Sequence, residues 1–170
     1  MKIKTRAITA SAASAAVIFV VTYLIRIPVP GSSGGYLNIG DIAIYLSAFV
    51  LGPIPAAVAA AAGSAVSDAL AGAVVYVPAT FVIKGLMGLI CGRLARSGRF
   101  APFTAGAVIS GAVMAAGYFA FETAVFGAAY AVTSVIPNII QWGVCAAAAA
   151  ALYPGAAKLT DQIGSAKNRK

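Results

Sequence analysis

One lysine interrupts an otherwise apolar stretch of the sequence, TFVIKGLMGLI at residues 80–90, and its charge requires an explanation. A second apolar stretch contains an acid, Glu122, with Tyr118 one helical turn before it on the same face. A base, an acid and an aromatic ring are groups that can bind a small, flat, hydrogen-bonding solute. Lys84, Tyr118 and Glu122 are therefore the first candidate binding residues.

A third apolar stretch presents its polar residues at helical spacing. Asn138, Gln141, Trp142 and Cys145 stand at positions i, i+3, i+4 and i+7, which places them on one face of a helix. The amides could bind hydroxyls of a solute, and the indole could stack on its ring. We therefore add Asn138, Gln141 and Trp142 to the candidate binding residues.

The residue types argue against catalysis. Histidine is absent, and the two cysteines, Cys91 and Cys145, lie inside apolar stretches. We find no nucleophile with a base, no metal-ligand spacing and no phosphate-binding glycine loop. The sequence predicts no catalytic residue, no metal, no cofactor and no enzymatic activity.

Composition identifies the environment of these residues. Of 170 residues, 61% are hydrophobic and only 9% are charged, and the mean hydropathy is +0.94. A soluble domain has roughly 25% charged residues, so an integral membrane protein is expected. The net charge is +8, but the basic residues are not interleaved with aromatic residues, so the charge does not indicate nucleic-acid binding.

Apolar stretches separated by glycine, proline and charge predict six membrane helices in a single all-α domain over residues 1–170. Their expected ranges are 7–26, 40–52, 54–72, 77–95, 102–126 and 134–156, the second being short. The first apolar stretch is longer than the roughly 7–15 residues of a signal-peptide core, so a retained helix is expected.

Charge fixes the expected orientation. With six helices, ten of the twelve basic residues fall on the side of both termini, which predicts cytoplasmic termini in a prokaryotic cell membrane. Lys84 then lies about 10 Å below the outer surface at 1.5 Å per residue, level with Glu122. The inner half offers only small and aliphatic residues, so we expect a one-sided pocket and no ion pathway.

Three further features near the outer side bear on the pocket. The loop at residues 27–41 carries Tyr36 and Asn38, which are further candidate binding residues, and it either covers the pocket or only connects helices. Asp41 is expected to cap the second predicted helix. Asp68 either faces the pocket or holds Lys84 or Arg26 in place, and the structural role is favoured.

The candidate residues also have plain structural interpretations. Lys84 and Glu122 could form an ion pair that only sets helix packing. Trp142 could belong to an interfacial aromatic belt, and the two amides could join helices. A membrane structural or assembly protein is the alternative function that these interpretations imply.

Ala12 and Ala16 form a small-xxx-small pair on the first predicted helix. Small residues allow helices to approach closely in lipid, so this face could dock onto another membrane protein. Any ATP-driven step would have to belong to such a partner.

Residues 38–92 resemble the substrate-binding S components of energy-coupling factor (ECF) transporters, in the riboflavin, hydroxymethylpyrimidine and pyridoxine branch. The resemblance rests on Gly40-Asp41, Gly52-Pro53, Gly63-Ser64 with Asp68, and Pro78 with Ile83-Lys84-Gly85.

The resemblance implies a six-helix bundle that binds a water-soluble vitamin between helices 4, 5 and 6, under the first loop. It implies that helix 1 contacts a transmembrane coupling subunit through Ala12 and Ala16, that this subunit joins two ATPases, and that the S component topples to deliver its solute. A pyridoxine-like (vitamin B6) or hydroxymethylpyrimidine-like ring is favoured, and riboflavin remains possible.

Overall fold

Six α-helices make up almost all of the protein. The structure, a computed structural model, describes residues 5–28 and 36–168. The helices are α1 (Thr5–Leu24), α2 (Gly40–Leu51), α3 (Pro53–Leu70), α4 (Val77–Leu94), α5 (Phe100–Phe126) and α6 (Ala128–Asn168). Short 3-10 turns, η1 (Val74–Tyr76) and η2 (Ala95–Ser97), precede and follow α4. Two three-residue strands, β1 (Arg26–Pro28) and β2 (Tyr36–Asn38), pair antiparallel with Arg26 opposite Asn38.

The predicted all-α membrane fold is confirmed. Among the described residues, five helices are long and apolar enough to cross a membrane, and the 12-residue α2 is the short one. Helices α1 to α5 begin and end within about two residues of the predicted ranges, which is the usual uncertainty of helix ends.

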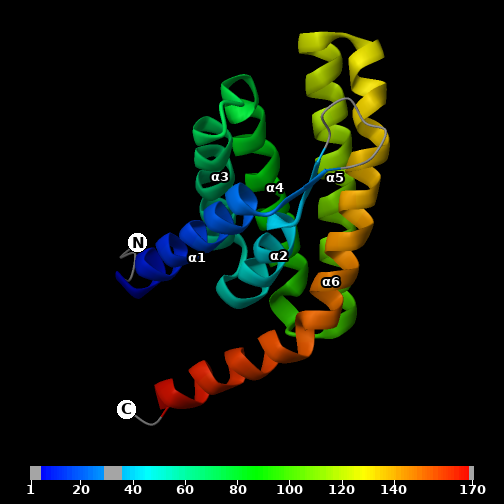
Figure 1. Cartoon of the computed structure of the whole chain (residues 1–170). Helices are drawn as coiled ribbons and strands as arrows, with labels where there is room; N and C mark the ends of the chain where they lie inside the picture. Colours follow the sequence, from blue (N-terminus) through cyan, green and yellow to red (C-terminus); the bar gives the residue numbers. More distant parts are fainter. Residues whose placement is uncertain (1–4, 29–35, 169–170) are drawn as a thin grey trace.

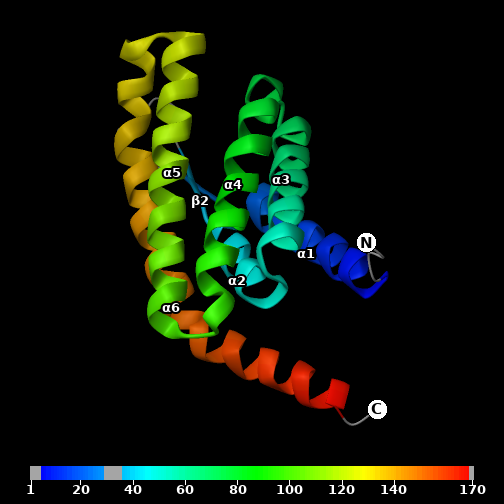
Figure 2. The same cartoon turned by 180° about the vertical axis from the view of Figure 1, so that it is seen from behind.

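Helix α6 departs most from the prediction, because it begins six residues earlier than expected and continues far past residue 156. Pro137 and Pro154 both lie inside it. The helix bends in its orange stretch, and its last part runs at an angle to the bundle (Figures 1 and 2). Proline removes one backbone hydrogen bond and bends a helix, but it need not end it.

The helices are arranged as two hairpins around a central short helix. Helices α3 and α4 form one pair, and α5 and α6 form the other. Helix α1 packs obliquely across α3, whereas α2 contacts α1, α4 and α6 (Figures 1 and 2). Helix α2 and the short hairpin thus lie where the two pairs meet.

The close pairing of α3 with α4 depends on glycine. A Cβ at Gly88 would lie 2.7 Å from the Ala56 carbonyl oxygen, and one at Gly92 would lie 2.6 Å from Pro53 Cα. Helices in lipid associate through such close backbone contacts.

A glycine also makes the tight turn between α5 and α6. Gly127 has a φ of 89°, a conformation that other residues adopt only with strain, and it is the single residue between the two helices. This turn lies at the same end of the bundle as the α3–α4 turn (Figure 1).

The opposite end of the bundle carries the basic residues. The α4–α5 connection lies there, and Tyr153 of α6 donates a hydrogen bond to its Gly98 carbonyl oxygen. Four basic side chains of this end are exposed: Arg93, Arg96, Arg99 and Lys158. Their grouping is what the charge pattern predicts for a cytoplasmic end.

Candidate binding site

One cavity of about 270 Å³ lies in the half of the bundle away from the exposed basic residues. Its lining comes from α1, β2, α3, the α3–α4 turn, α4, α5 and α6. The lining residues are Thr22, Asn38, Ser64, Asp68, Ala73, Tyr76, Thr80, Lys84, Tyr118, Glu122, Tyr130, Ser134, Pro137, Asn138 and Gln141. Six of the eight predicted solute-binding residues are in this set.

A buried ion pair orients the lysine of the cavity. Lys84 Nζ donates to Asp41 Oδ1, and both side chains are almost fully buried. The alternative in which Lys84 pairs with Glu122 is therefore wrong. The expected capping role of Asp41 is also wrong, because Ile39 is the residue before α2 and Asp41 binds Lys84 instead. An ammonium has three N–H donors, so Lys84 can still donate to a solute.

Gln141 joins this ion pair to the hairpin. Its Nε2 donates to Asp41 Oδ2 at 2.7 Å, and its Oε1 accepts from the Asn38 backbone N–H at 2.9 Å. Asn38 in turn accepts from the Gly40 N–H through its own Oδ1 at 2.8 Å. The interpretation of Gln141 as a residue that joins helices is supported, since both ends of its amide are engaged by the protein.

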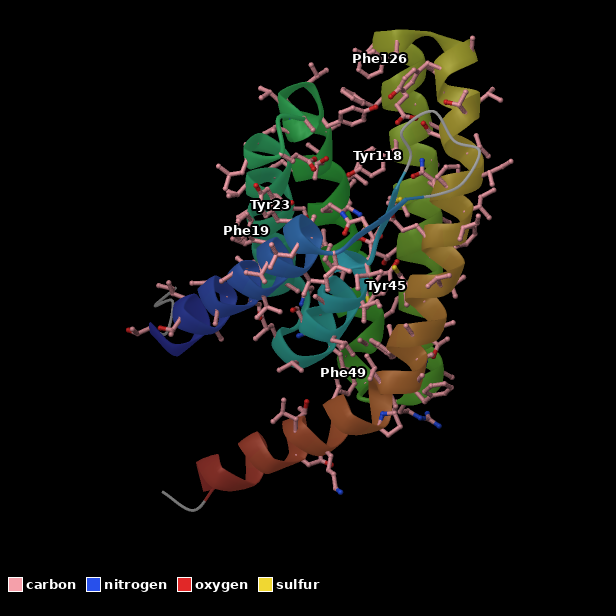
Figure 3. All side chains as sticks on the ribbon, in the orientation of Figure 1. Phe19, Tyr23, Tyr45, Phe49, Tyr118 and Phe126 are labelled. Carbon is pink, nitrogen blue, oxygen red and sulfur yellow. The ribbon has the colours of Figure 1, made fainter. Side chains whose placement is uncertain are left out.

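Tyr118 forms an aromatic wall beside Lys84. Lys84 Nζ lies 5.6 Å from the centre of the Tyr118 ring, within the range of a cation–π contact. The Tyr118 hydroxyl lies 2.9 Å from Thr80 Oγ1. Figure 3 shows Tyr118 on α5 with its side chain on the side of α4.

Glu122 lies nearer the α3–α4 and α5–α6 turns. Tyr76 donates from its hydroxyl to Glu122 Oε1 at 3.1 Å, and the Tyr76 hydroxyl is 3.3 Å from that of Tyr130. The other carboxyl oxygen, Oε2, is buried without a hydrogen-bond partner among the described residues. A buried acceptor of this kind is ready to receive a donor from a solute.

Two further buried oxygens of the cavity lack a partner in the described structure. They are Thr22 Oγ1 on α1 and Ser64 Oγ on α3. Near them, Asp68 lines the cavity and accepts a hydrogen bond from Thr80 Oγ1. Asp68 thus faces the cavity and also bonds to α4, and the side chain of Arg26, one of its expected partners, lies outside the described residues.

Two predicted solute-binding residues and the two predicted docking residues lie elsewhere or outside the described residues. Trp142 is not among the described residues that line the cavity. Its indole occupies the space in front of Gly111 on α5, where an added Cβ would overlap it. The side chain of Tyr36 and residues 29–35 of the predicted cover lie outside the described residues. Ala12 and Ala16 are exposed on α1.

Helical periodicity would have found several lining residues that the sequence analysis missed. Thr80 and Tyr76 precede Lys84 by four and eight residues, and Ser134 and Tyr130 precede Asn138 by the same steps. Residues at these spacings share a helix face. Ser64 precedes Asp68 by four residues on α3, so the same spacing would have found it. Thr22 carries no such signal, because no other candidate binding residue lies on α1.

The described residues contain no cluster suited to a metal. Within residues 5–28 and 36–168, no three His, Cys, Asp or Glu side chains come together to hold an ion. The chemistry available in the cavity is hydrogen bonding, charge and aromatic contact.

Comparison with known proteins identifies the family. The sequence model described as "ECF-type riboflavin transporter, S component" matches residues 2–158. A solved structure titled "Structure and mechanism of the S component of a bacterial ECF transporter" superposes with a TM-score of 0.73 at 19% identity. That match covers 92% of this chain and 98% of the other, and it confirms the fold.

Two curated relatives match about three quarters of the chain. One, from Pyrococcus woesei, is described as "Uncharacterized protein in gap 3'region" and is 37% identical over 125 residues, 73% of this chain and 83% of the relative. The other is the "Thiamine precursor transporter HmpT" of Lactococcus lactis subsp. cremoris (strain MG1363). It is 31% identical over 126 residues, 74% of this chain and 72% of the relative.

Proposed function

The chain belongs to the family of ECF-type riboflavin transporter S components, and we propose that it captures a single-ring heteroaromatic vitamin or vitamin precursor in the cavity described above. It is a multi-pass membrane component of a vitamin transporter. The proposal concerns the chemical class of the solute, the residues that hold it and the partners that use it.

The size of the cavity supports a compact solute. Its volume of about 270 Å³ lies near the lower end of the roughly 300–1,000 Å³ range of small-molecule pockets. A single ring with short substituents fits such a space better than a fused three-ring flavin with a polyol chain. The Lactococcus relative is named a thiamine precursor transporter, which agrees with a vitamin precursor as the solute.

The single observation that carries the proposal is the Oε2 atom of Glu122, a residue only 5% exposed, which has no hydrogen-bond partner among the described residues and lies in a cavity that also holds a lysine. We assign Glu122 to a ring N–H, amino or hydroxyl donor, and Lys84 to an oxygen or ring nitrogen acceptor. Tyr118 provides an aromatic surface for the ring, and Asn138 and Asn38 provide further polar contacts. Hydroxymethylpyrimidine and pyridoxine (vitamin B6) both carry this combination of groups.

The transport step requires partners. We propose that the exposed Ala12–Ala16 face of α1 docks onto a transmembrane coupling subunit, and that two ATPase subunits supply the energy. Small exposed residues on a membrane helix permit close helix contact, which supports this face as the docking surface.

A binding panel tests the proposal. Purified protein in detergent is titrated with hydroxymethylpyrimidine, pyridoxine and riboflavin, with heat of binding as the readout. We expect one of the two single-ring compounds to bind with the highest affinity. Binding of riboflavin alone would contradict the proposed solute class. Binding of none of the three, together with no thermal stabilisation by any B vitamin, would favour a purely structural membrane protein.

A further inference from the structure

Thr22 and Ser64 place two hydroxyls in the cavity wall that α1 and α3 supply. The two residues are 2% and 1% exposed, and among the described residues neither Oγ1 of Thr22 nor Oγ of Ser64 has a hydrogen-bond partner. Both residues line the cavity. Buried hydroxyls nearly always have partners, so two unpartnered ones in one cavity indicate a missing ligand atom.

The Thr22 hydroxyl lacks a hydrogen bond that other hydroxyls of α1 form. Thr9 and Ser11 of α1 satisfy their hydroxyls by donating to the backbone carbonyl four residues earlier, at 3.1 and 2.9 Å. Thr and Ser side chains in helices commonly adopt this local bond. Thr22 does not form it, although nothing in the helix sequence prevents it, and its hydroxyl lines the cavity instead.

Gly40 allows the Thr22 hydroxyl to lie directly against the start of α2. A Cβ added at this first residue of α2 would overlap Thr22 Oγ1 and would lie 2.8 Å from Asn38 Oδ1. Any side chain at position 40 would therefore collide with the Thr22 hydroxyl and displace it from its place in the cavity wall. This close approach is part of the built structure, because Gly40 itself is buried.

We propose that Thr22 and Ser64 form a hydroxyl subsite that binds the alcohol substituent of the solute. A hydroxyl is both a donor and an acceptor, so two protein hydroxyls can satisfy a solute alcohol in both directions. Glu122 on α5 recognises the donor edge of the same ring from the other helix pair. This assignment rests on the proposed function, and it adds α1 and α3 to the helices that contact the solute.

The subsite defines which solutes are preferred. A ring with a hydroxymethyl or hydroxyl group gains hydrogen bonds to Thr22 and Ser64, whereas the analogue with a methyl group leaves both hydroxyls unsatisfied. Sites built to bind a hydroxyl discriminate against the analogue that lacks it for this reason. We therefore expect selectivity for the alcohol form.

The test compares two probes on four proteins. The probes are hydroxymethylpyrimidine and the analogue in which methyl replaces hydroxymethyl, and the proteins are wild type, Thr22→Val, Ser64→Ala and Ser67→Ala. Ser67 is the matched control, because its hydroxyl is also buried and unpartnered on α3 but does not line the cavity. Affinities are measured by titration calorimetry, and thermal unfolding is recorded for each apo protein.

We expect Thr22→Val and Ser64→Ala each to lower affinity for the hydroxymethyl probe on the order of threefold to tenfold, as for loss of a neutral hydrogen bond. Affinity for the methyl probe should be unchanged, and Ser67→Ala should bind both probes as wild type does. The apo variants should unfold at the wild-type temperature or above, because an unsatisfied hydroxyl has been removed.

Equal loss for both probes, or no loss for either, would overturn the hydroxyl subsite while leaving the proposed function in place. If wild type binds neither hydroxymethylpyrimidine nor its methyl analogue, the titration is repeated with pyridoxine and with the analogue in which methyl replaces one hydroxymethyl group. A wild type that binds none of the four would overturn the proposed solute class itself, and the subsite with it.

Discussion

Lys84 on α4 and Asp41 on α2 form an ion pair whose side chains are only 2% and 1% exposed. Gln141 holds the second carboxyl oxygen of Asp41 and, at the same time, the backbone of Asn38. The lysine that interrupts the apolar stretch of α4 is thus fixed by three elements before any solute arrives. Because the Lys84 side chain is already ordered, solute binding costs less conformational entropy.

Asp41→Ala should destabilise the protein strongly. It leaves the Lys84 ammonium buried without a counter-charge, and breaking one side of a buried pair costs about 3–5 kcal/mol. The measurement is thermal unfolding in detergent. The double variant Asp41→Leu with Lys84→Met should recover much of the loss, because no buried charge remains. Wild-type stability of Asp41→Ala would contradict the pairing.

Glu122→Gln should weaken solute binding without unfolding the protein. The variant keeps the shape of the side chain and removes the charge that the solute donor meets. Hydrogen bonds to charged groups contribute about 1.5–3 kcal/mol, so affinity should fall on the order of tenfold to a hundredfold. Calorimetric titration with the tightest ligand of the panel measures it. Asp161→Asn, which changes an exposed acid on α6, is the control and should bind as wild type does.

Gln141→Leu should loosen the hairpin. The variant leaves the Asn38 N–H and Asp41 Oδ2 without their partners, at a cost of about 1–3 kcal/mol. Amide hydrogen exchange at Asn38 should become faster. Gln141→Glu separates the two bonds, since it keeps the acceptor for Asn38 but faces Asp41 with a second carboxyl. Unchanged exchange at Asn38 in Gln141→Leu would show that the amide does not hold β2.

Gly111→Ala should displace the only tryptophan of the sequence. An added Cβ would overlap the Trp142 indole, and overpacking costs about 1–3 kcal/mol. The fluorescence maximum of Trp142 reports the displacement. Trp142→Phe, in contrast, should leave solute affinity unchanged. A large loss of affinity in Trp142→Phe, with normal stability, would show that the indole contacts the solute after all.

Ala16→Leu should impair uptake and spare solute binding. Ala16 is exposed on α1 and is not among the residues that line the cavity, and leucine would prevent close helix contact with a coupling subunit. Uptake of labelled solute by cells and binding by purified protein are measured side by side. Ala105→Leu makes the same change on the exposed face of α5 and should affect neither. Equal loss of uptake and binding in Ala16→Leu would show that the alanine face supports the fold instead.

The helices were largely predictable because their ends carry local signals. Gly52-Pro53 ends α2 and begins α3, and Gly127 ends α5. Helix α6 was mispredicted because glycine, proline and charge were used to place the helix ends. Within a helix that neighbouring helices and lipid support, proline bends the chain and does not stop it.

The site was predictable only in part, because its key contacts join residues far apart in the sequence. Asp41 and Lys84 are 43 positions apart, and an Asp in the first turn of a helix has the same local signature whether it caps the helix or pairs elsewhere. Trp142 follows Gln141 by one residue, so the two side chains differ by about 100° around the helix. Periodicity could not tell which of them faces the cavity.

Mass spectrometry of small molecules released from the purified protein tests the central claim most directly. A cavity of this size with a buried acid and base should retain its solute through purification. We expect wild type to release a single-ring heteroaromatic compound that carries an alcohol, and Glu122→Gln to release much less of it. Release of a flavin, or release of the same amount of compound from both proteins, would contradict the account.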